Sequence, residues 1–222
     1  MIAKTWHPDK TISLQDHELA VWLDDGVLIR DAHPDEYSEI GDIRVGAYLA
    51  DGFLSPDSGY APRLRELGTD GLDPVLVAVD DHGTLIGTVM LQVWPQGGGV
   101  VKGPDEAEIR ALAVRPEARG AGVGRALLAA VIDRAARLDV QHLVLLTQPE
   151  MKAAHHLYNI AGFSRLPERD WSPEPDVRLL AYSMRLAPAG EPRGASCTPA
   201  SRLGLAESPR WGAVGKQRSS GC

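Results

Sequence analysis

Residues 108–128 read Glu-Ile-Arg-Ala-Leu-Ala-Val-Arg-Pro-Glu-Ala-Arg-Gly-Ala-Gly-Val-Gly-Arg-Ala-Leu-Leu and predict a strand, a glycine-rich turn and the start of a helix. The strand ends near Val114, because Pro116 has no N–H with which to continue a ladder. The glycines that follow let backbone N–H groups approach a ligand without a Cβ in the way. A helix beginning there adds unpaired donors and a positive dipole end, which favours phosphate. Arg119 and Arg125 can add charge-assisted contacts.

The spacing of these glycines excludes two common phosphate-binding motifs. A dinucleotide fingerprint requires G-x-G-x-x-G, but Arg125 stands at the third glycine position, and about six residues separate the strand from the glycines. A triphosphate loop requires G-x-x-x-x-G-K-[ST], which this chain lacks. What remains is R-x-x-G-x-G, formed by Arg119, Gly122 and Gly124. Taken alone, this pattern fits a purely structural glycine-rich helix entry equally well.

A second informative block lies further along the chain, where Leu157-Tyr-Asn-Ile-Ala-Gly-Phe163 has the pattern L-Y-x-x-x-G-F. The two blocks, in this order, resemble the GNAT superfamily of N-acetyltransferases, whose pyrophosphate-binding motif is similar to the R-x-x-G-x-G found here. The resemblance covers residues 27–186 in element order. It implies an acyl-CoA-dependent N-acyltransferase, with acetyl-CoA as co-substrate and no metal.

The order of apolar segments predicts the fold class. Asp80-Asp81-His82-Gly83 is a hairpin turn signal, and apolar residues at helical spacing predict a helix over 123–138. The expected strands are 27–30, 75–79, 85–93, 108–114, 142–147 and 177–186, and the expected helices are 35–49, 61–67, 123–138 and 151–160. This order predicts an α/β fold with a mixed central sheet flanked by helices on both faces. The resemblance further implies that the sheet is mostly antiparallel.

The resemblance also implies how acetyl-CoA is bound. The co-substrate lies where the fourth and fifth strands of the family fold separate. The backbone of Leu112, Ala113 and Val114 then meets the pantetheine arm and offers an N–H to the thioester oxygen. The pyrophosphate is held by the turn and the helix start, namely Arg119, Gly120, Gly122, Val123, Gly124 and Arg125.

Glu108 is the candidate general base. An attacking ammonium must first lose a proton, because its pKa is near that of lysine, about 10. Period-two alternation predicts that Glu108 shares a strand face with Arg110 and Leu112. The resemblance to histone-modifying members of the family implies that this carboxylate takes the proton, directly or through water. A solvated strand-end charge is the alternative, and Glu106 is a weaker candidate base.

Tyr158 is the candidate general acid, because the family presents a tyrosine hydroxyl to the sulfur of CoA from the helix after the fifth strand. A packed aromatic ring is the alternative. His155 and His156 precede it and are expected at the helix surface, without a metal. Thr147 and Gln148 are expected to line the cleft. An asparagine that many relatives place near the start of this helix is absent here, which puts that CoA contact in doubt.

Length and composition set the remaining expectations. The 222 residues are enough for one domain, expected over 27–186. Residues 1–26 form an extension of uncertain order, and residues 187–222, rich in Pro, Gly and Ser, a disordered tail. The net charge of −7 argues against nucleic acid as a partner, and no apolar run is long enough to cross a membrane. The only cysteines, Cys197 and Cys222, lie in the tail, and a cytoplasmic location is expected.

The acceptor is not defined by the sequence beyond a small-molecule amine or a peptide or protein amine. The resemblance implies that residues 35–67 and 165–176 determine which acceptor is bound. The second segment contains Arg169, Asp170, Trp171, Glu174 and Asp176. Acidic groups beside an aromatic ring can receive a cationic amine, although an ordinary polar loop has the same composition. A homodimer is compatible with the resemblance. The alternative function is a non-catalytic CoA-binding regulatory module, against which the intact Gly122, Gly124 and Tyr158 argue.

Overall fold

The structure is a computed structural model that describes residues 11–14, 18–22, 26–96, 99–174 and 177–187. The expected tail from 188 onward and much of the extension before 27 lie outside these ranges. Two segments of that extension are strands, β1 (Thr11–Leu14) and β2 (Glu18–Trp22). The sequence had left residues 19–23 open between strand and helix.

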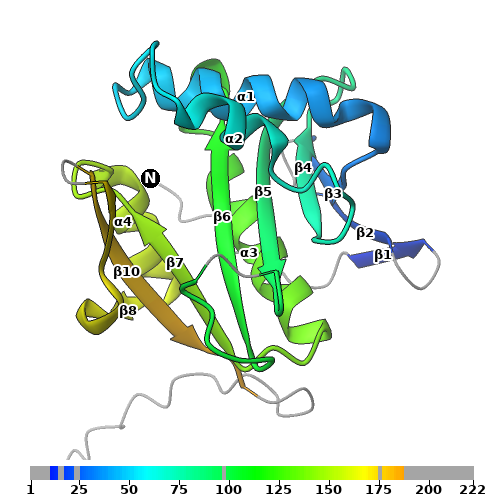
Figure 1. Ribbon diagram of the computed structural model, residues 1–222. Coiled ribbons are helices and arrows are strands. Elements are labelled where there is room, and N and C mark those ends of the chain that lie inside the picture. Colours follow the sequence, from blue (N-terminus) through cyan, green and yellow to red (C-terminus); the bar gives the residue numbers. More distant parts are fainter. Residues whose placement is uncertain (1–10, 15–17, 23–25, 97–98, 175–176, 188–222) are drawn as a thin grey trace, which may run out of the picture. The chain divides into compact units, whose positions relative to one another are not determined.

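A sheet of ten strands organises the described residues, in the order β1-β2-β3-β4-β5-β6-β7-β10-β8 with β9 paired to β10 (Figure 1). The further strands are β3 (Leu28–Asp31), β4 (Val75–Val79), β5 (Leu85–Val93), β6 (Glu106–Val114), β7 (His142–Thr147), β8 (Ser164–Arg165), β9 (Trp171–Glu174) and β10 (Val177–Arg185). Every recorded pair is antiparallel except β6 with β7. The prediction of a mixed, mostly antiparallel sheet is confirmed.

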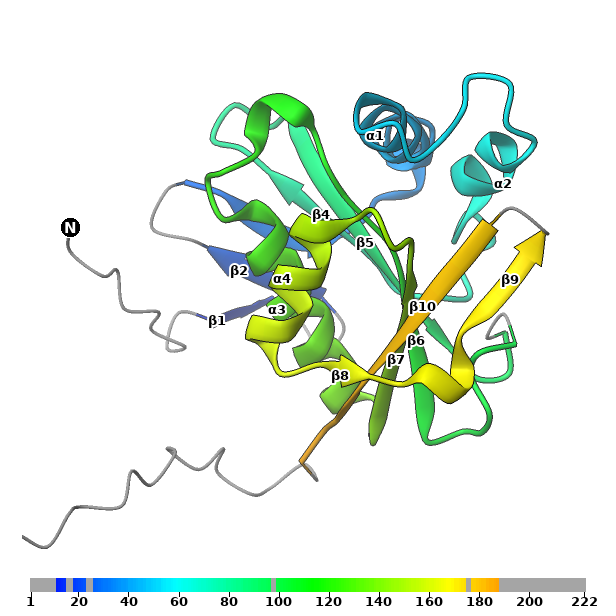
Figure 2. The same ribbon diagram turned by 90° about the vertical axis from the view of Figure 1, so that its left-hand side faces the viewer.

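Helices cover both faces of this sheet (Figure 2). They are α1 (Tyr37–Ala50), α2 (Tyr60–Glu66), α3 (Val123–Arg137) and α4 (Lys152–Ala161). Helices α1 and α2 lie on one face, whereas α3 and α4 lie on the other. Short 3-10 turns precede α1 and α3. No helix in the described ranges is long and apolar enough to span a membrane.

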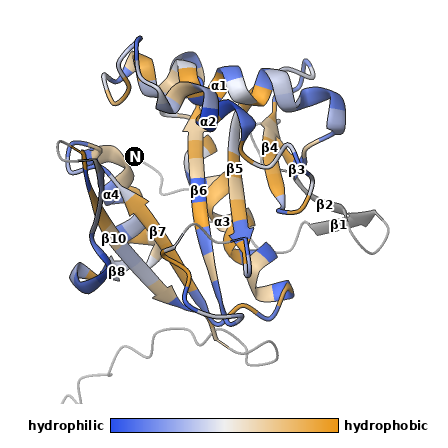
Figure 3. Cartoon of the chain, in the orientation of Figure 1, coloured by the Kyte–Doolittle hydropathy of each residue, from blue (hydrophilic) through white to orange (hydrophobic). Residues whose placement is uncertain are grey.

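Two apolar layers hold the sheet between the helices. Leu127, Leu128 and Val131 of α3 are buried against one face, and Ile40 and Ile43 of α1 against the other. Burying each such side chain contributes about 1.5–3 kcal/mol. Figure 3 shows hydrophobic residues concentrated on the central strands. The central part of the molecule is therefore a rigid support for the loops at its edges.

Strand β6 changes its facing pattern at a β-bulge. Its register on β5 shifts, so that Ala111 and Leu112 together stand opposite one residue of β5. Ala111 adopts a φ of 51° and is buried against α1 and α2, whereas Leu112 packs against the core beneath α3. The expectation that Leu112 shares a strand face with Glu108 and Arg110 is therefore wrong, because the bulge interrupts the alternation.

The bulge coincides with a separation between β6 and β7. The two strands pair only over 106–109 and 142–145. Beyond this point, the edge of β6 that faces β7 over residues 110–114 has no partner among the described strands. A parallel pair that opens part-way leaves backbone N–H and C=O groups free to bind something other than a strand.

The segment expected as a loop over 165–176 contains secondary structure. It begins at the end of β8, passes through the 3-10 turn Pro167–Arg169 and continues into β9, which pairs with β10. Strand β9 was not predicted from the sequence, which indicated a loop for this segment. It contains Pro173, a residue that is disfavoured in central strands. Its place beside β10, outside the main strand order, is consistent with that rule.

Candidate functional site

The glycine-rich turn presents free backbone donors at the start of α3. Gly120 and Gly122 have φ values of 81° and 84°, and a Cβ at either position would meet nothing within 4 Å. The first helical hydrogen bond is donated by Ala126 to the carbonyl of Gly122. Within the described chain, the N–H groups of Val123 and the two residues after it have no recorded acceptor. The turn therefore leaves consecutive donors and open space where an anion would bind.

Gly124 connects this turn with two other parts of the predicted site. A Cβ at Gly124 would lie 3.7 Å from Val114 and 3.8 Å from Leu157. The start of α3 is thus beside the end of β6 and beside α4, one residue from Tyr158. Both distances are ordinary van der Waals contacts, so packing alone does not demand glycine at this position. Close approach of a ligand to the helix backbone supplies a reason.

The two arginines of the turn have different surroundings. Arg119 forms an ion pair with Asp51 at 2.7 Å and donates to the carbonyl of Ala47, both at the end of α1. It also lies 3.4 Å from the carbonyl of Val114. Arg125 is exposed and forms no recorded hydrogen bond or ion pair in the described chain. Arg119 therefore fixes the turn to α1, and Arg125 is the cation free to meet a phosphate.

Glu108 lies on the sheet face that α1 and α2 cover. Its side chain is 5% exposed, and its register partners are Gln92 of β5 and Val144 of β7. The Nε atom of Arg110 lies 3.8 Å from a Glu108 carboxylate oxygen, and Arg110 also donates to the side chain of Gln92 at 2.8 Å. Gln92 in turn donates to Asp73. Glu108 is thus a buried carboxylate next to a partly exposed guanidinium, at the point where β6 and β7 separate.

Glu106, the weaker candidate base, is fully engaged elsewhere. Both of its carboxylate oxygens accept from Arg169, at 2.7 and 2.8 Å, and one accepts from the N–H of Lys102. The hydrogen bonds from Arg169 lower the pKa of Glu106, although burial opposes them. A carboxylate held as an anion by a bidentate partner is a poor proton acceptor, so these contacts favour Glu108 over Glu106 as the candidate base.

Tyr158 lies on the opposite face of the sheet. Its ring is 7% exposed and packs against Phe163 and Tyr182. No hydrogen bond to its hydroxyl is recorded in the described chain, so the hydroxyl is available as a donor. Burial raises the pKa of Tyr158 well above its ordinary value, and the nearby Tyr48 raises it further. Tyr158 therefore remains protonated at neutral pH.

The polar residues after β7 join the two sides of the opening. Gln148 donates to the carbonyl of Phe53, in the loop between α1 and α2, at 3.1 Å. His155 lies 3.0 Å from the Gln148 carbonyl, whereas His156 is exposed. Thr147 is buried and donates to Met151. In the described chain, no group of three or more His, Cys, Asp or Glu side chains is arranged to hold a metal ion.

Comparison with known proteins now identifies the family. A profile of the Acetyltransferase (GNAT) family matches residues 37–163, more than half of the chain. The chain belongs to this family. The match includes the glycine-rich turn and the L-Y-x-x-x-G-F block, so the resemblance inferred from those two motifs is confirmed.

Two curated relatives and one solved structure are similar to this GNAT chain. An uncharacterized N-acetyltransferase of Schizosaccharomyces pombe is 34% identical over 110 residues, which are 50% of this chain and 63% of that protein. The L-2,4-diaminobutyric acid acetyltransferase of Chromohalobacter salexigens is 35% identical over 122 residues, 54% of this chain and 56% of that protein. The chain therefore matches less than two thirds of either relative. The yncA structure from Salmonella typhimurium, solved with its cofactor acetyl-CoA, has a TM-score of 0.56 at 23% identity, covering 77% of this chain and 99% of that one. This likeness establishes the GNAT fold.

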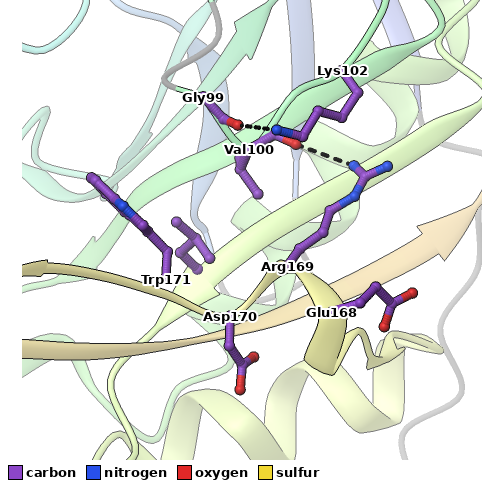
Figure 4. A pocket seen from close by; sticks show the side chains of 8 residues that line it. Gly99, Val100, Lys102, Glu168, Arg169, Asp170 and Trp171 are labelled. Atoms are coloured by element: carbon purple, nitrogen blue, oxygen red, sulfur yellow. Dashed lines mark hydrogen bonds between the residues drawn. The ribbon is translucent and has the colours of Figure 1, made fainter.

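A pocket of about 290 Å³ lies on the Glu108 side of the GNAT sheet (Figure 4). Leu146 contributes from β7, two residues beyond Val144 and on the same face. The loop before β6 and the segment before β9 supply the other walls, Gly99, Val100, Lys102, Glu168, Arg169, Asp170 and Trp171. Arg169 lines the pocket and also binds Glu106, two residues before Glu108. The pocket therefore lies on the same face of the sheet as the candidate base, although Glu108 is not among its lining residues.

The charges of the 165–176 segment are arranged differently from the sequence expectation. Asp170 pairs with Arg165 and Arg178, so its carboxylate is already engaged by cations and is not free for a cationic amine. Arg169, which is itself a cation, pairs with Glu106. The side chains of Glu174 and Asp176 lie outside the described residues. Trp171 is half exposed in the pocket wall, consistent with an aromatic contact surface.

Sequence reasoning missed several polar residues of the α1 side. Gln92 and Asp73 belong to the network around Arg110, and Arg44 and Tyr48 of α1 lie nearby. The burial of Arg44 could have been predicted from the sequence. It occupies position 44 of the predicted helix, on the same face as the apolar stripe that the residues at positions 40, 43 and 47 form. A charged residue on such a stripe must be buried, and a buried charge requires an explanation.

Proposed function

We propose that this protein transfers an acetyl group from acetyl-CoA to a primary amine by direct attack in a ternary complex. The observation that carries the proposal is the position of Gly124 between Val114 and Leu157, which lie 3.7 and 3.8 Å from where its Cβ would be. At this point the N–H donors of the α3 start, the open edge of β6 and the helix of Tyr158 come together, and Glu108 lies on the other face of the sheet.

The residues fit acetyl-CoA, which supplies a thioester-activated acetyl group when bound. The N–H groups of Val123, Gly124 and Arg125, with the Arg125 side chain, meet the pyrophosphate, and Gly122 leaves room for it. The backbone N–H and C=O groups along the edge of residues 112–114 bind the pantetheine arm in the way that they would bind a neighbouring strand. An N–H of that edge donates to the thioester oxygen, where negative charge develops. Arg119 acts through the turn that it fixes to α1.

Proton transfer is divided between the two sheet faces. Glu108 takes a proton from the ammonium, directly or through water, so that nitrogen can form its bond to the acetyl carbon. The bond from that carbon to sulfur breaks, and Tyr158 donates its hydroxyl proton to the departing thiolate. The nitrogen loses its second proton as the amide forms, and this proton returns through solvent to the Tyr158 oxygen, while Glu108 releases the proton that it took to solvent. No electron transfer is involved, and no metal is required for this sequence of steps. The pocket beside Arg169 and Trp171 lies on the same sheet face as Glu108.

Release of free CoA in the presence of an amine tests this function against the alternative of a non-catalytic CoA-binding module. Purified protein is mixed with acetyl-CoA and a panel of amines and peptides, and free thiol is followed with time. We expect amine-dependent release that Glu108→Gln reduces at neutral pH. Tight binding of acetyl-CoA without release for any amine would favour the binding module.

A further inference from the structure

One stripe of α1 carries polar side chains into the interior. Tyr37, Gly41, Arg44 and Tyr48 recur at successive turns of the helix and therefore share a face. A Cβ at Gly41 would lie 3.1 Å from the Cα of Arg65 in α2, so this face lies against α2. Among the described residues, Arg44 is the largest completely buried side chain, with 0% exposure. Its guanidinium lies within reach of the end of α2, where it donates to Leu67, and α1 and α2 lie side by side on one face of the sheet (Figure 1).

Arg44 has no anionic partner among the described residues. Its Nη1 donates to the carbonyl of Leu67, at the end of α2, at 2.6 Å. Its Nε and Nη2 atoms are buried and have no acceptor. Burying a cation costs several kcal/mol unless an anion compensates for it. The hydrogen bond to Leu67 uses only one nitrogen of the guanidinium. The fold therefore gives no structural reason for burying the other two nitrogens without acceptors.

The surroundings of Arg44 keep it charged. Burial lowers its pKa to about 10, Tyr48 and Tyr37 oppose that change, and Arg110 adds to it. At neutral pH, Arg44 is still a cation, beside a second guanidinium. Burial raises the pKa of Tyr48 to about 12, so its hydroxyl remains a donor. No hydrogen bond of that hydroxyl is recorded in the described chain.

This cluster lies directly above the β6 bulge. Tyr48 packs in the apolar cluster that contains Ala111, the bulge residue. Arg110 precedes the bulge on the same face and approaches Glu108. Tyr60, at the start of α2 and 40% exposed, is the nearest of the group to solvent. Arg110 thus lies between the candidate base, which it approaches at 3.8 Å, and the group of Arg44, Tyr48 and Tyr60, whose charges it meets.

We propose that the acceptor of this enzyme carries a carboxylate beside its amine, and that Arg44 and Tyr48 bind this carboxylate while the amine meets Glu108. A guanidinium fork binds a carboxylate through two parallel hydrogen bonds, and Nε with Nη2 provides such a pair. Arg110 stabilises the same charge. Movement of the Tyr60 side chain opens the path to Arg44. The acceptor class is therefore a free amino acid or a related amino acid derivative. This inference rests on the proposed acetyltransferase function.

Matched pairs of acceptors test it. Each pair is an amino acid and the amine that its decarboxylation would leave: L-2,4-diaminobutyrate with 1,3-diaminopropane, L-lysine with cadaverine, and L-phenylalanine with phenethylamine. CoA release is measured for wild type and for Arg44→Met, Arg44→Lys and the control Arg65→Met. Arg65 is exposed and pairs with Asp42 on the outer side of the same two helices. Succinate serves as a probe that has carboxylates but no amine.

For wild type, we expect the amino acid of at least one pair to have a lower KM than its decarboxylated partner. Arg44→Met raises the KM of that amino acid by about tenfold to a hundredfold, which is the loss typical of a hydrogen-bonded charge. The KM of the decarboxylated amine stays within about twofold of its wild-type value. Arg44→Lys, which keeps the charge but not the fork, gives an intermediate KM. Arg65→Met behaves as wild type. Succinate competes with the acceptor in wild type but not in Arg44→Met.

Other outcomes overturn the inference without touching the enzyme assignment. Equal activity on both members of every active pair, or an equal loss on both members in Arg44→Met, makes Arg44 structural. If no acceptor releases CoA, the proposed function fails for this panel. In that case, a rise in the melting temperature with succinate in wild type but not in Arg44→Met still supports the anion site, and no rise in wild type refutes it.

Discussion

Glu108 and Tyr158 lie on opposite faces of the sheet, so the two proton transfers can be tested independently. Replacing Glu108 by Gln keeps the shape of the side chain and removes its basicity. We expect kcat/KM to fall by about 10²–10⁴-fold at neutral pH, the usual contribution of a positioned base. The deficit should shrink as pH rises toward the amine pKa of about 10, because free amine then becomes abundant. The measurement is a pH–rate profile from pH 6 to 10.

Glu66→Gln, at an exposed position near the end of α2, is the control and should follow the wild-type profile. A deficit in Glu108→Gln that stays constant across the pH range would assign Glu108 to binding or structure.

Tyr158→Phe keeps the ring packing and removes the hydroxyl alone. Because the hydroxyl has no recorded partner in the described chain, acetyl-CoA affinity and thermal stability should change little. We expect kcat to fall by about a hundredfold, the low end for a general acid, since a thiolate is a fair leaving group. The measurement combines steady-state kinetics with titration calorimetry. Tyr182→Phe, in the same aromatic cluster, is the matched control, and full activity of Tyr158→Phe would remove the acid assignment.

At the scale of elements, a separate prediction concerns the start of α3. Gly124→Asp places a negative charge where the pyrophosphate is expected, and its Cβ contacts, at 3.7 and 3.8 Å, are tolerable. We expect acetyl-CoA affinity to fall by about tenfold to a hundredfold, since charge-assisted hydrogen bonds are replaced by repulsion. Calorimetric titration measures this loss. Gly46→Asp, at an exposed position of α1 where a Cβ would meet nothing within 4 Å, controls for the added charge, and unchanged affinity in Gly124→Asp would refute the pyrophosphate site.

Some elements could be predicted to the residue because their ends carry local signals. Strands β4 and β5 were predicted with their observed bounds, since Asp80 turns the chain by accepting from the N–H groups of His82 and Thr84. Helix α3 starts at Val123, as expected from the glycines before it. These signals act over a few residues and do not depend on tertiary contacts.

Other features depend on partners distant in sequence. The residues around Ala111 in the sequence carry no signal for a bulge. The positive φ of Ala111 belongs to the shifted pairing of β6 with β5, which depends on residues distant in sequence. Glu106 and Arg169 are 63 positions apart in the sequence. Their ion pair could not be predicted from the residues around either of them. The roles of Glu108 and Tyr158, taken from the family resemblance, stay predictions.

At the scale of the whole molecule, the Glu106–Arg169 pair fastens the segment before β9 onto the sheet. The pKa of Glu106 is lowered in the fold, so its contribution is present above the unfolded pKa of about 4.3 and lost as pH falls through the folded value. Arg169→Met should therefore lower the melting temperature at pH 7, by about 2–4 °C for each kcal/mol lost, and the difference from wild type should shrink below pH 4.

Melting curves between pH 3 and 8 check this expectation. Arg137→Met removes the exposed pair with Asp133 on α3 and serves as the control, with little change expected. A pH-independent difference between Arg169→Met and wild type would mean that Arg169 stabilises the fold through packing and not through charge.

The extra residue in β6 also bears on how this sheet could have arisen. Ala111 lies on the same side as Arg110, and Leu112 resumes the alternation from there. Without Ala111, every other side chain of the strand would still face the helix that it faces now. An insertion of one residue at this point is therefore neutral for the burial of the rest of the strand, although it lies where β6 and β7 stop pairing.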